Sequence, residues 1–233
     1  MSIEAAEQDL SIQENYSPEE SRFWVCTYPH FEASVFIFQA ERNRGVVHEY
    51  SLYDADGSQI NSGGIAFPFA NTGVIELGPL LGKCKLESGL KHAQFCITSP
   101  HGCGHLVRLI GKEKASILHP LIEIHEQASN FVPLSVGPSA QNLANVVNFS
   151  DSDTQVRLRL FIGKRTPEHV VELPAYGSRS VNIENAFADY LPDGVGSTIA
   201  YLRISSKDSA KVGLQILEIK ENGESSFSVQ GFC

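Results

Sequence analysis

The chain contains an internal repeat, and this repeat limits the possible fold more than any other feature of the sequence. Shifting the sequence by 107 positions places residues 93–99 over residues 200–206, and residues 107–110 over residues 214–217. Apolar residues meet apolar residues in both blocks. Because loops tolerate single-residue deletions, a neighbouring shift of 108 belongs to the same repeat, which predicts two copies of one domain. The shift of 108 aligns Leu52-Tyr53 with Leu160-Phe161, Ile75-Glu76 with Ile183-Glu184, and Phe38 with Val146.

The repeat divides the 233 residues into four parts. We predict a first β-sandwich over residues 22–126 and a second over residues 142–233, each near the roughly 100 residues of a small sandwich. Residues 127–141 contain two prolines and a glycine, which is typical of a linker with limited freedom. Residues 1–21 are acidic and poor in aromatic residues, which predicts a disordered, solvated arm. A short partner-docking helix over residues 3–10 is the alternative for this arm.

Local patterning within each copy predicts strands. Apolar residues alternate with arginines over residues 156–161, which is the period of a strand with one buried face. Short strand-like segments are separated by Gly, Pro, Asn, Asp and Ser, as in a sandwich. Residues 185–191 and their counterpart 77–81 are the places where we expect a helical turn. The fold class predicted is all-β, with two tandem antiparallel β-sandwich domains.

A resemblance to a known family rests mainly on the second copy. It is carried by residues 148–161, by Leu-Pro-Ala-Tyr-Gly-Ser at 173–178, and by Ile204-Ser-Ser206 before Val212-Gly-Leu-Gln215. These segments resemble the small bacterial β-sandwich of sensory rhodopsin transducer proteins and of many adhesin-like repeats. The first copy matches loosely, because Phe67-Pro68-Phe69 only approximates the Leu-Pro-Ala turn. The resemblance implies a sandwich that oligomerises or binds partners, and it implies no catalytic residue.

Charge is concentrated in the arm. The chain has 27 acidic and 18 basic residues, a formal net charge of −9, and six of the acidic residues lie within residues 1–20. An acidic chain disfavours non-specific binding to nucleic acid or an anionic membrane, so we expect neither as a partner. The acidic N-terminus lacks the basic start and apolar stretch of a signal peptide, which favours a cytoplasmic location. In such a reducing compartment, the five cysteines are expected as buried thiols or metal ligands rather than disulfides.

One cluster of sulfur and imidazole side chains is a candidate metal site. It consists of Cys96, His101, Cys103 and His105, and thiolate and imidazole are the ligands that zinc prefers. Against a metal site, the cluster holds no Cys-x-x-Cys pair, and the repeat places residues 101–105 at a hairpin turn. Two interpretations stay open. These residues form a metal-binding or small-ligand site, or they form a turn that carries thiols and imidazoles without a ligand.

Other motifs do not indicate catalysis or a cofactor. Asp54-Ala-Asp-Gly57 has its glycine two positions too early for a helix-loop-helix calcium site, and it is predicted to be a hairpin turn. Gly78-Pro-Leu-Leu-Gly-Lys-Cys84 is one residue short of a phosphate-binding loop and ends in Cys instead of Ser or Thr. A Gly-x-Ser-x-Gly nucleophile elbow is missing from the sequence. We therefore expect a protein that is not an enzyme and that uses no cofactor.

Arginines on the second copy form the candidate partner-binding surface. If Leu158 and Leu160 face the core, Arg157 and Arg159 face outward, and Arg203 faces outward by the same parity. Several arginines on one sheet face suit an acidic protein surface or the chain's own acidic arm. The alternative is a solvated face with cross-strand pairs to Glu168 and Glu172.

The function predicted from the sequence is a non-enzymatic, protein-binding or self-assembling structural module built from duplicated β-sandwiches. Exposed edge strands of such domains pair readily with another copy or another chain unless they are blocked. A sandwich that binds metal or a small ligand through the Cys/His cluster is the alternative.

Overall fold

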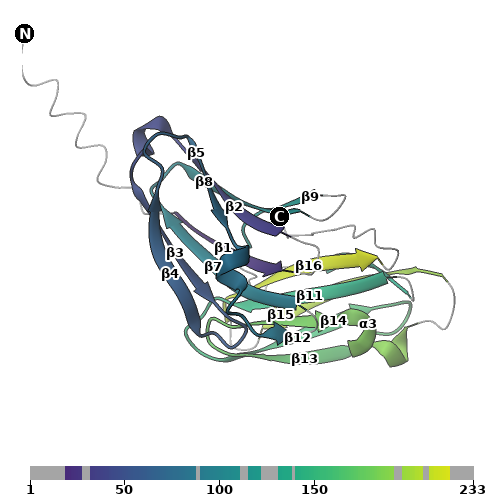
Figure 1. The fold of residues 1–233 in the computed structure, drawn as a ribbon. Coiled ribbons are helices and arrows are strands. Elements are labelled where there is room, and N and C mark those ends of the chain that lie inside the picture. Colours follow the sequence, from purple (N-terminus) through teal and green to yellow (C-terminus); the bar gives the residue numbers. More distant parts are fainter. Residues whose placement is uncertain are drawn as a thin grey trace, which may run out of the picture.

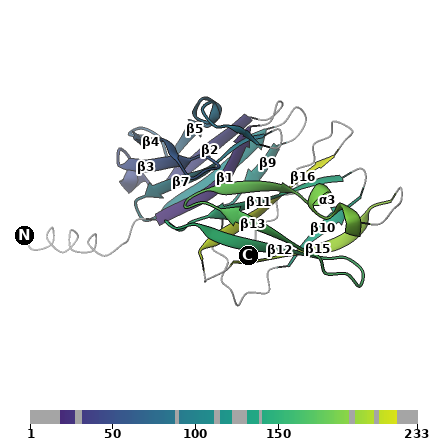
Figure 2. The same cartoon turned by 90° about the horizontal axis from the view of Figure 1, so that it is seen from below.

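The structure is a computed structural model of the chain, and it describes residues 19–27, 32–87, 90–110, 115–121, 131–137, 140–191, 196–206 and 210–220. The described residues form antiparallel sheets that build two β-sandwich domains, so the predicted all-β class is confirmed. We call strands β1 to β9 domain 1 and strands β10 to β16 domain 2. Figure 1 shows the two sandwiches packed side by side, and Figure 2 shows the same packing from below.

Domain 1 consists of sheets A and B. Sheet A has the strand order β1-β7-β3-β4, with the short β6 pairing to β7, and sheet B has the order β5-β2-β8-β9. The strands are β1 (Glu19–Thr27), β2 (Glu32–Gln39), β3 (Val47–Tyr53), β4 (Gln59–Ala66), β5 (Thr72–Glu76), β6 (Leu86–Glu87), β7 (Leu90–Ser99), β8 (Cys103–Ile110) and β9 (Ala115–Leu118).

Domain 2 consists of sheets C and D. Sheet C has the order β14-β11-β16, and sheet D has the order β10-β15-β12-β13. The strands are β10 (Phe131–Val136), β11 (Ala140–Asn148), β12 (Thr154–Phe161), β13 (Glu168–Leu173), β14 (Ser178–Asn182), β15 (Thr198–Ser206) and β16 (Val212–Lys220).

The two domains share one topology, which gives the internal repeat its structural form. Sheet D repeats the order of sheet A, and sheet C repeats β5-β2-β8 of sheet B. The ladders also match residue by residue. Tyr50 pairs with Ile97 in sheet A as Leu158 pairs with Ile204 in sheet D, which agrees with the shifts of 108 and 107.

Two blocks of the sequence alignment are displaced in the structure. Val35 pairs with Val107 of β8, and Val146 pairs with Leu214 of β16, so Phe38 corresponds to Phe149 and not to Val146. On the other side of the same sheets, the ladders match Glu76 with Ser180 and not with Glu184. The connection that precedes each of these strands differs by about two residues between the domains, and a match of apolar positions does not detect such a difference.

Strands also extend into segments that we predicted to lie outside the domains. β10 and the start of β11 fall within the predicted linker, residues 127–141. Pro133 fits there because β10 is an edge strand, where proline is tolerated. β1 begins at Glu19, inside the predicted acidic arm, whose residues 1–18 lie outside the described residues.

Throughout the residues that the structure describes, helical structure is confined to short turns. Three of them overlap the predicted places, namely α2 (Gly78–Leu81), α3 (Ile183–Ala186) and η3 (Ala188–Tyr190), whereas η2 (Glu41–Asn43), in the β2–β3 connection, was not predicted. The Asn182 side chain caps α3 by accepting a hydrogen bond of 2.8 Å from the Asn185 N–H. Leu81 and Ile183 are fully buried, so each turn closes one end of its sandwich. Among the described residues, no helix has the length and apolar character needed to cross a membrane.

Each sandwich has its own apolar core. In domain 2, Val156, Leu158 and Leu160 point between the sheets and are fully buried, as their alternation predicts. Phe95 and Ile97 of β7 do the same in domain 1. Burying a side chain of this size contributes about 1.5 to 3 kcal/mol, so the cores are the main source of stability.

A third apolar cluster joins the domains. Trp24, Cys26 and Leu90 on the outer face of sheet A pack on the outer face of sheet C, and the cluster is completed by Leu143, Val147, Phe149 and Leu217. Part of the outer face of one sheet of each sandwich is therefore buried, and the two domains form a joined unit instead of two separately solvated ones.

Hydrogen bonds from a turn complete this junction. Asp54-Ala-Asp-Gly57 forms the predicted hairpin turn between β3 and β4, and the Ala55 carbonyl accepts from the Ser178 N–H at 3.1 Å and from Arg179 Nη1 at 2.6 Å. Gly57 has a φ of +79°, and a Cβ at this position would lie 1.8 Å from the Ala175 carbonyl oxygen. Glycine is therefore required by the backbone and by the neighbouring domain at the same position.

Candidate interaction surface

The outer face of sheet D carries the three predicted partner-binding arginines. Arg159 of β12 lies directly opposite Arg203 of β15, and Arg157 lies opposite Ser205. Their strand neighbours Leu158 and Leu202 point into the core. The arginines therefore share one outward face, the arrangement that alternation predicts.

Two of these arginines share one carboxylate. Arg157 Nε lies 3.1 Å from Glu168 Oε2, and Arg159 pairs with Glu168 Oε1. On the same face, Gln155 Nε2 donates to Glu172 Oε1 at 2.7 Å. The cross-strand pairing expected for a solvated face is thus present at Glu168. Exposed pairs of this kind contribute about 0 to 1 kcal/mol, so the arginines are not needed for stability.

Aromatic side chains accompany the arginines, and the sequence reasoning missed them. The rings of Phe131 and Phe161 lie 5.1 Å apart in an edge-to-face arrangement, and the Arg203 guanidinium lies 5.7 Å from the Phe131 ring. Tyr201 lies opposite Phe161 in the ladder. Phe131 was missed because it falls in the predicted linker. Phe161 and Tyr201 alternate in step with the arginines, so the same strand period could have placed both rings on this face. We call this surface the D face: Phe131, Arg157, Arg159, Phe161, Tyr201 and Arg203.

The structure separates the four residues of the predicted metal cluster. His101 Nδ1 lies 2.8 Å from the Glu19 carboxylate, and the Asn43 amide donates to Cys103 Sγ at 3.4 Å. Cys96 lies opposite Ser51, on the outer face of sheet A, while His105 points between the sheets. Across the described ranges, no three His, Cys, Asp or Glu side chains are placed to hold a metal ion. The described part of the chain gives the metal-site interpretation no support, because Cys96 and His105 point to different sides of sheet A.

Burial keeps the thiols of this segment protonated. It raises the pKa of the Cys96 thiol to about 12, and it raises the pKa of Cys103 as well. The thiolate is the nucleophilic form of cysteine, so these protonated thiols are weak nucleophiles.

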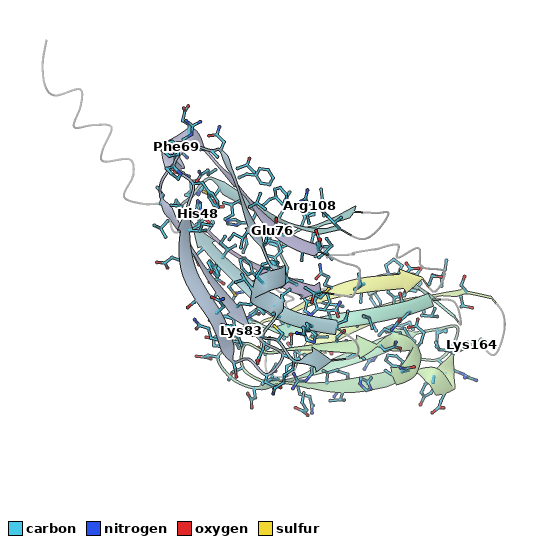
Figure 3. The ribbon with its side chains drawn as sticks, viewed as in Figure 1. His48, Phe69, Glu76, Lys83, Arg108 and Lys164 are labelled. Atoms are coloured by element: carbon cyan, nitrogen blue, oxygen red, sulfur yellow. The ribbon has the colours of Figure 1, made fainter. Side chains whose placement is uncertain are left out.

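His105 instead belongs to a buried chain of hydrogen bonds at one end of domain 1, where Figure 3 labels His48. Its Nδ1 lies 2.8 Å from Ser21 Oγ, and its Nε2 lies 2.7 Å from Ser99 Oγ. Ser99 Oγ lies 2.8 Å from His48 Nδ1, and His48 Nε2 lies 2.9 Å from Gln39 Oε1.

The direction of every bond in this chain follows from Gln39. Its amide nitrogen donates to the carbonyls of Phe67 and Ala70, so its oxygen accepts and His48 Nε2 carries the proton. Ser99 then donates to His48 Nδ1 and accepts from His105 Nε2. The chain is fully satisfied with both imidazoles neutral, in agreement with burial lowering the pKa of His48 and lowering that of His105 to about 4.

A groove follows the junction between the domains. It is lined by Glu20, Arg22 and Cys96 of sheet A and continues to Phe149 and Lys211 of domain 2. The Arg22 guanidinium lies 5.3 Å from the centre of the Phe149 ring and donates to the Phe149 carbonyl at 3.1 Å. The polar groups that line this groove therefore hold the two domains together.

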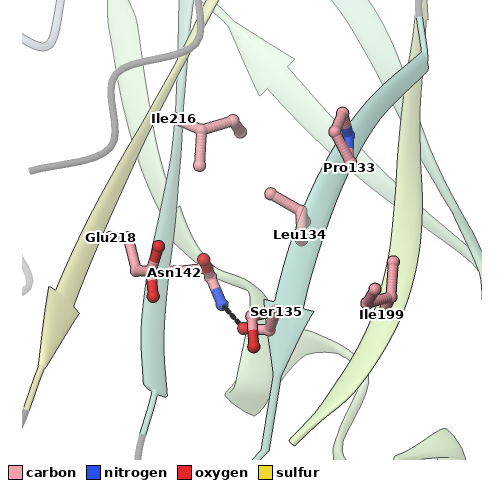
Figure 4. Close-up of a pocket in the computed structure, with 7 residues that line it drawn as sticks. All are labelled: Pro133, Leu134, Ser135, Asn142, Ile199, Ile216 and Glu218. Carbon is pink, nitrogen blue, oxygen red and sulfur yellow. Dashed lines mark hydrogen bonds between the residues drawn. The ribbon is translucent and has the colours of Figure 1, made fainter.

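A separate pocket of about 230 Å³ opens at one side of domain 2 (Figure 4). Asn142 Nδ2 donates across it to the Ser135 carbonyl at 2.9 Å and also to Glu184. Burial raises the pKa of the Glu184 carboxyl, while hydrogen bonds from Asn142 act in the opposite direction. This amide thus joins β10 to β11 and α3, which is a structural role.

Comparisons with known proteins do not place the chain in a family. It matches no protein-family model and no curated protein. Among solved structures, it is similar to the naturally occurring empty particles, or top component, of cowpea mosaic virus. The identity is 9%, the match covers 88% of this chain and 89% of the other, and the TM-score is 0.23. The fold assignment therefore rests on the strand order and register of the chain itself.

Proposed function

We propose that this protein is a non-enzymatic structural module that self-associates through the outer faces of its sheets. The observation that carries this proposal is the D face, where three arginines and three aromatic rings share one outward surface. Tyr, Phe and Arg are enriched in protein interfaces, and a few such residues supply most of the binding energy. The weak contribution of the Glu168 pairs to stability leaves recognition as the role that explains this surface.

The test is the oligomeric state of the full chain. Size-exclusion chromatography with light scattering, over a series of micromolar concentrations, is expected to show a defined oligomer. The double variant Arg159→Glu, Arg203→Glu places two negative charges among the aromatic rings and is expected to shift the chain toward monomer. Lys164→Glu is the control, because Lys164 is an exposed base in the β12–β13 turn and is not one of the D-face residues. A chain that is monomeric at every concentration would refute the proposal.

A further inference from the structure

The junction between the domains shows which surfaces of this fold fit each other. Inside the chain, sheet A of domain 1 packs its outer face on sheet C of domain 2. Sheet D has the strand order of sheet A, and sheet B contains the strand order of sheet C. The two faces left outside the junction are therefore the repeat-equivalent partners of the two faces inside it.

Sheet D presents apolar side chains at the positions that sheet A uses in the junction. The ladders place Ile199 where sheet A has His92, and Phe131 where it has Arg22. His92 and Arg22 are buried or half-buried against domain 2, whereas Ile199 is 69% exposed and Phe131 is 43% exposed. Ile199 lies beside the D face and extends it.

Sheet B presents apolar side chains at the positions that sheet C uses. Val74 stands where sheet C has Ser178, and Phe38 stands where it has Phe149. Val74 is 40% exposed and Phe38 is 42% exposed. We call this surface the B face: Glu32, Phe36, Phe38, Val74, Glu76 and Ile117.

The contacts of the junction translate into matched pairs between the free faces. His92 Nδ1 lies 3.1 Å from Ser178 Oγ, and the equivalent residues are Ile199 and Val74. Arg22 lies over the Phe149 ring, and the equivalent residues are Phe131 and Phe38. A polar pair thus becomes an aliphatic pair, and a cation–aromatic pair becomes an aromatic pair. Both substitutions suit a contact between two apolar surfaces.

Charge also favours contact between the two faces. Sheet D carries Arg157, Arg159 and Arg203 against two glutamates on its outer face, and the B face carries Glu32 and Glu76 beside Arg108. An excess of positive charge on one surface meets an excess of negative charge on the other.

We infer that the D face of one chain packs on the B face of a second copy, in a head-to-tail contact that repeats the geometry of the internal junction. This inference deepens the proposed self-association by naming both surfaces. A contact between two different faces is heterologous, so an open assembly keeps one free D face at one end and one free B face at the other until it closes into a ring.

The test uses two variants that each remove one face. Ile199→Asp disables the D face, and Val74→Asp disables the B face. Each variant alone is expected to be monomeric, with self-association at least about tenfold weaker than in the unmodified chain. An equimolar mixture is expected to form a complex of two chains and no larger species, because it contains one intact D face and one intact B face. Phe69→Asp is the control, since Phe69 is 94% exposed and lies outside both faces.

Each outcome of light scattering on these samples decides the inference. Monomers that combine on mixing support it. Monomers that stay separate on mixing, or a Val74→Asp variant that still forms dimers, overturn it, because the contact would then join two D faces or other surfaces. An unmodified chain that is itself monomeric overturns both the inference and the proposed function, whereas an oligomer unaffected by both variants overturns the inference alone. If an Asp variant fails to fold by circular dichroism, Tyr201→Ser or Val74→Ser replaces it.

Discussion

At the same end of the two sandwiches, domain 1 buries a chain of polar side chains and domain 2 buries valines. The ladders place Val156 where domain 1 has His48, and the repeat places Val212 where it has His105. All four residues are buried. One topology therefore accepts either filling, provided that the polar one satisfies each of its hydrogen bonds. The difference teaches that equivalent positions share a place in the core without sharing its chemistry.

The largest loss of stability is expected when an imidazole is placed in the apolar core of domain 2. Val156→His inserts a larger side chain, which costs about 1 to 3 kcal/mol, and leaves a ring nitrogen without the Gln39 amide, which costs about 1 to 3 kcal/mol more. We expect the free energy of unfolding in urea to fall by about 2 to 6 kcal/mol. Val156→Ile, which adds volume without a polar atom, separates the two contributions. A loss below about 1 kcal/mol would show that domain 2 also accepts an imidazole here.

The next effect is a loss of stability in acid that originates in domain 1. His105 has its pKa lowered from 6.5 to about 4, so between these values the unfolded chain binds a proton that the folded chain does not. The contribution of neutral His105 to the free energy of unfolding is fully present above pH 6.5. It decreases as the pH falls, and the loss reaches about 3 kcal/mol near pH 4. Urea unfolding at a series of pH values, followed by the fluorescence of the single tryptophan, Trp24, measures it.

His105→Val gives domain 1 the residue that domain 2 has at the equivalent position. It removes the acceptor for Ser21 and the donor to Ser99, with an expected cost of about 1 to 3 kcal/mol at pH 7.5. The same variant should flatten the loss between pH 6.5 and 4, because the titrating group is gone. The difference between the two pH curves isolates His105 from the carboxylates. Parallel curves would mean that His105 is protonated without cost in the folded protein.

The smallest effect is expected on the outer surface of domain 2. Glu168→Gln removes the carboxylate that Arg157 and Arg159 share, while keeping its size. The free energy of unfolding, measured by thermal denaturation, should change by less than about 1 kcal/mol, because exposed ion pairs contribute little to stability. Self-association, measured by light scattering, should not weaken, since both arginines become available to a partner. A large loss of stability would make these pairs structural.

How far sequence predicts this molecule depends on the range of the interactions. Alternation at residues 156–161 is local, so it predicted a strand and the outward direction of Arg157 and Arg159. The Cys96–His105 cluster gains no support from the structure, because nearness along the chain does not place side chains on one sheet face. The hydrogen-bond chain was missed because Gln39 and His48 belong to strands of different sheets, β2 and β3, which only the fold brings face to face. The domain junction was not predictable either, since Trp24 and Leu143 look like ordinary core residues.

The resemblance to sensory rhodopsin transducer sandwiches stays a prediction, although the residues that suggested it have a clear role. Asn148 Nδ2 donates to the carbonyls of Ser152 at 2.8 Å and of Pro174 at 2.9 Å. Asn148 therefore ties the Asn-rich turn to the Leu-Pro-Ala turn. Residues that stabilise a turn in this way indicate a fold and not a function, so evidence for function has to come from the sheet faces.

The apolar cluster between the domains also matters for synthesis on the ribosome. Sheet A is complete once β7 has emerged, but Trp24, Cys26 and Leu90 are covered only when β11 and β16 fold against them. About 100 residues separate β7 from the last of these strands, which corresponds to roughly 5 to 20 s of translation. During that interval the nascent first domain exposes these apolar side chains to solvent.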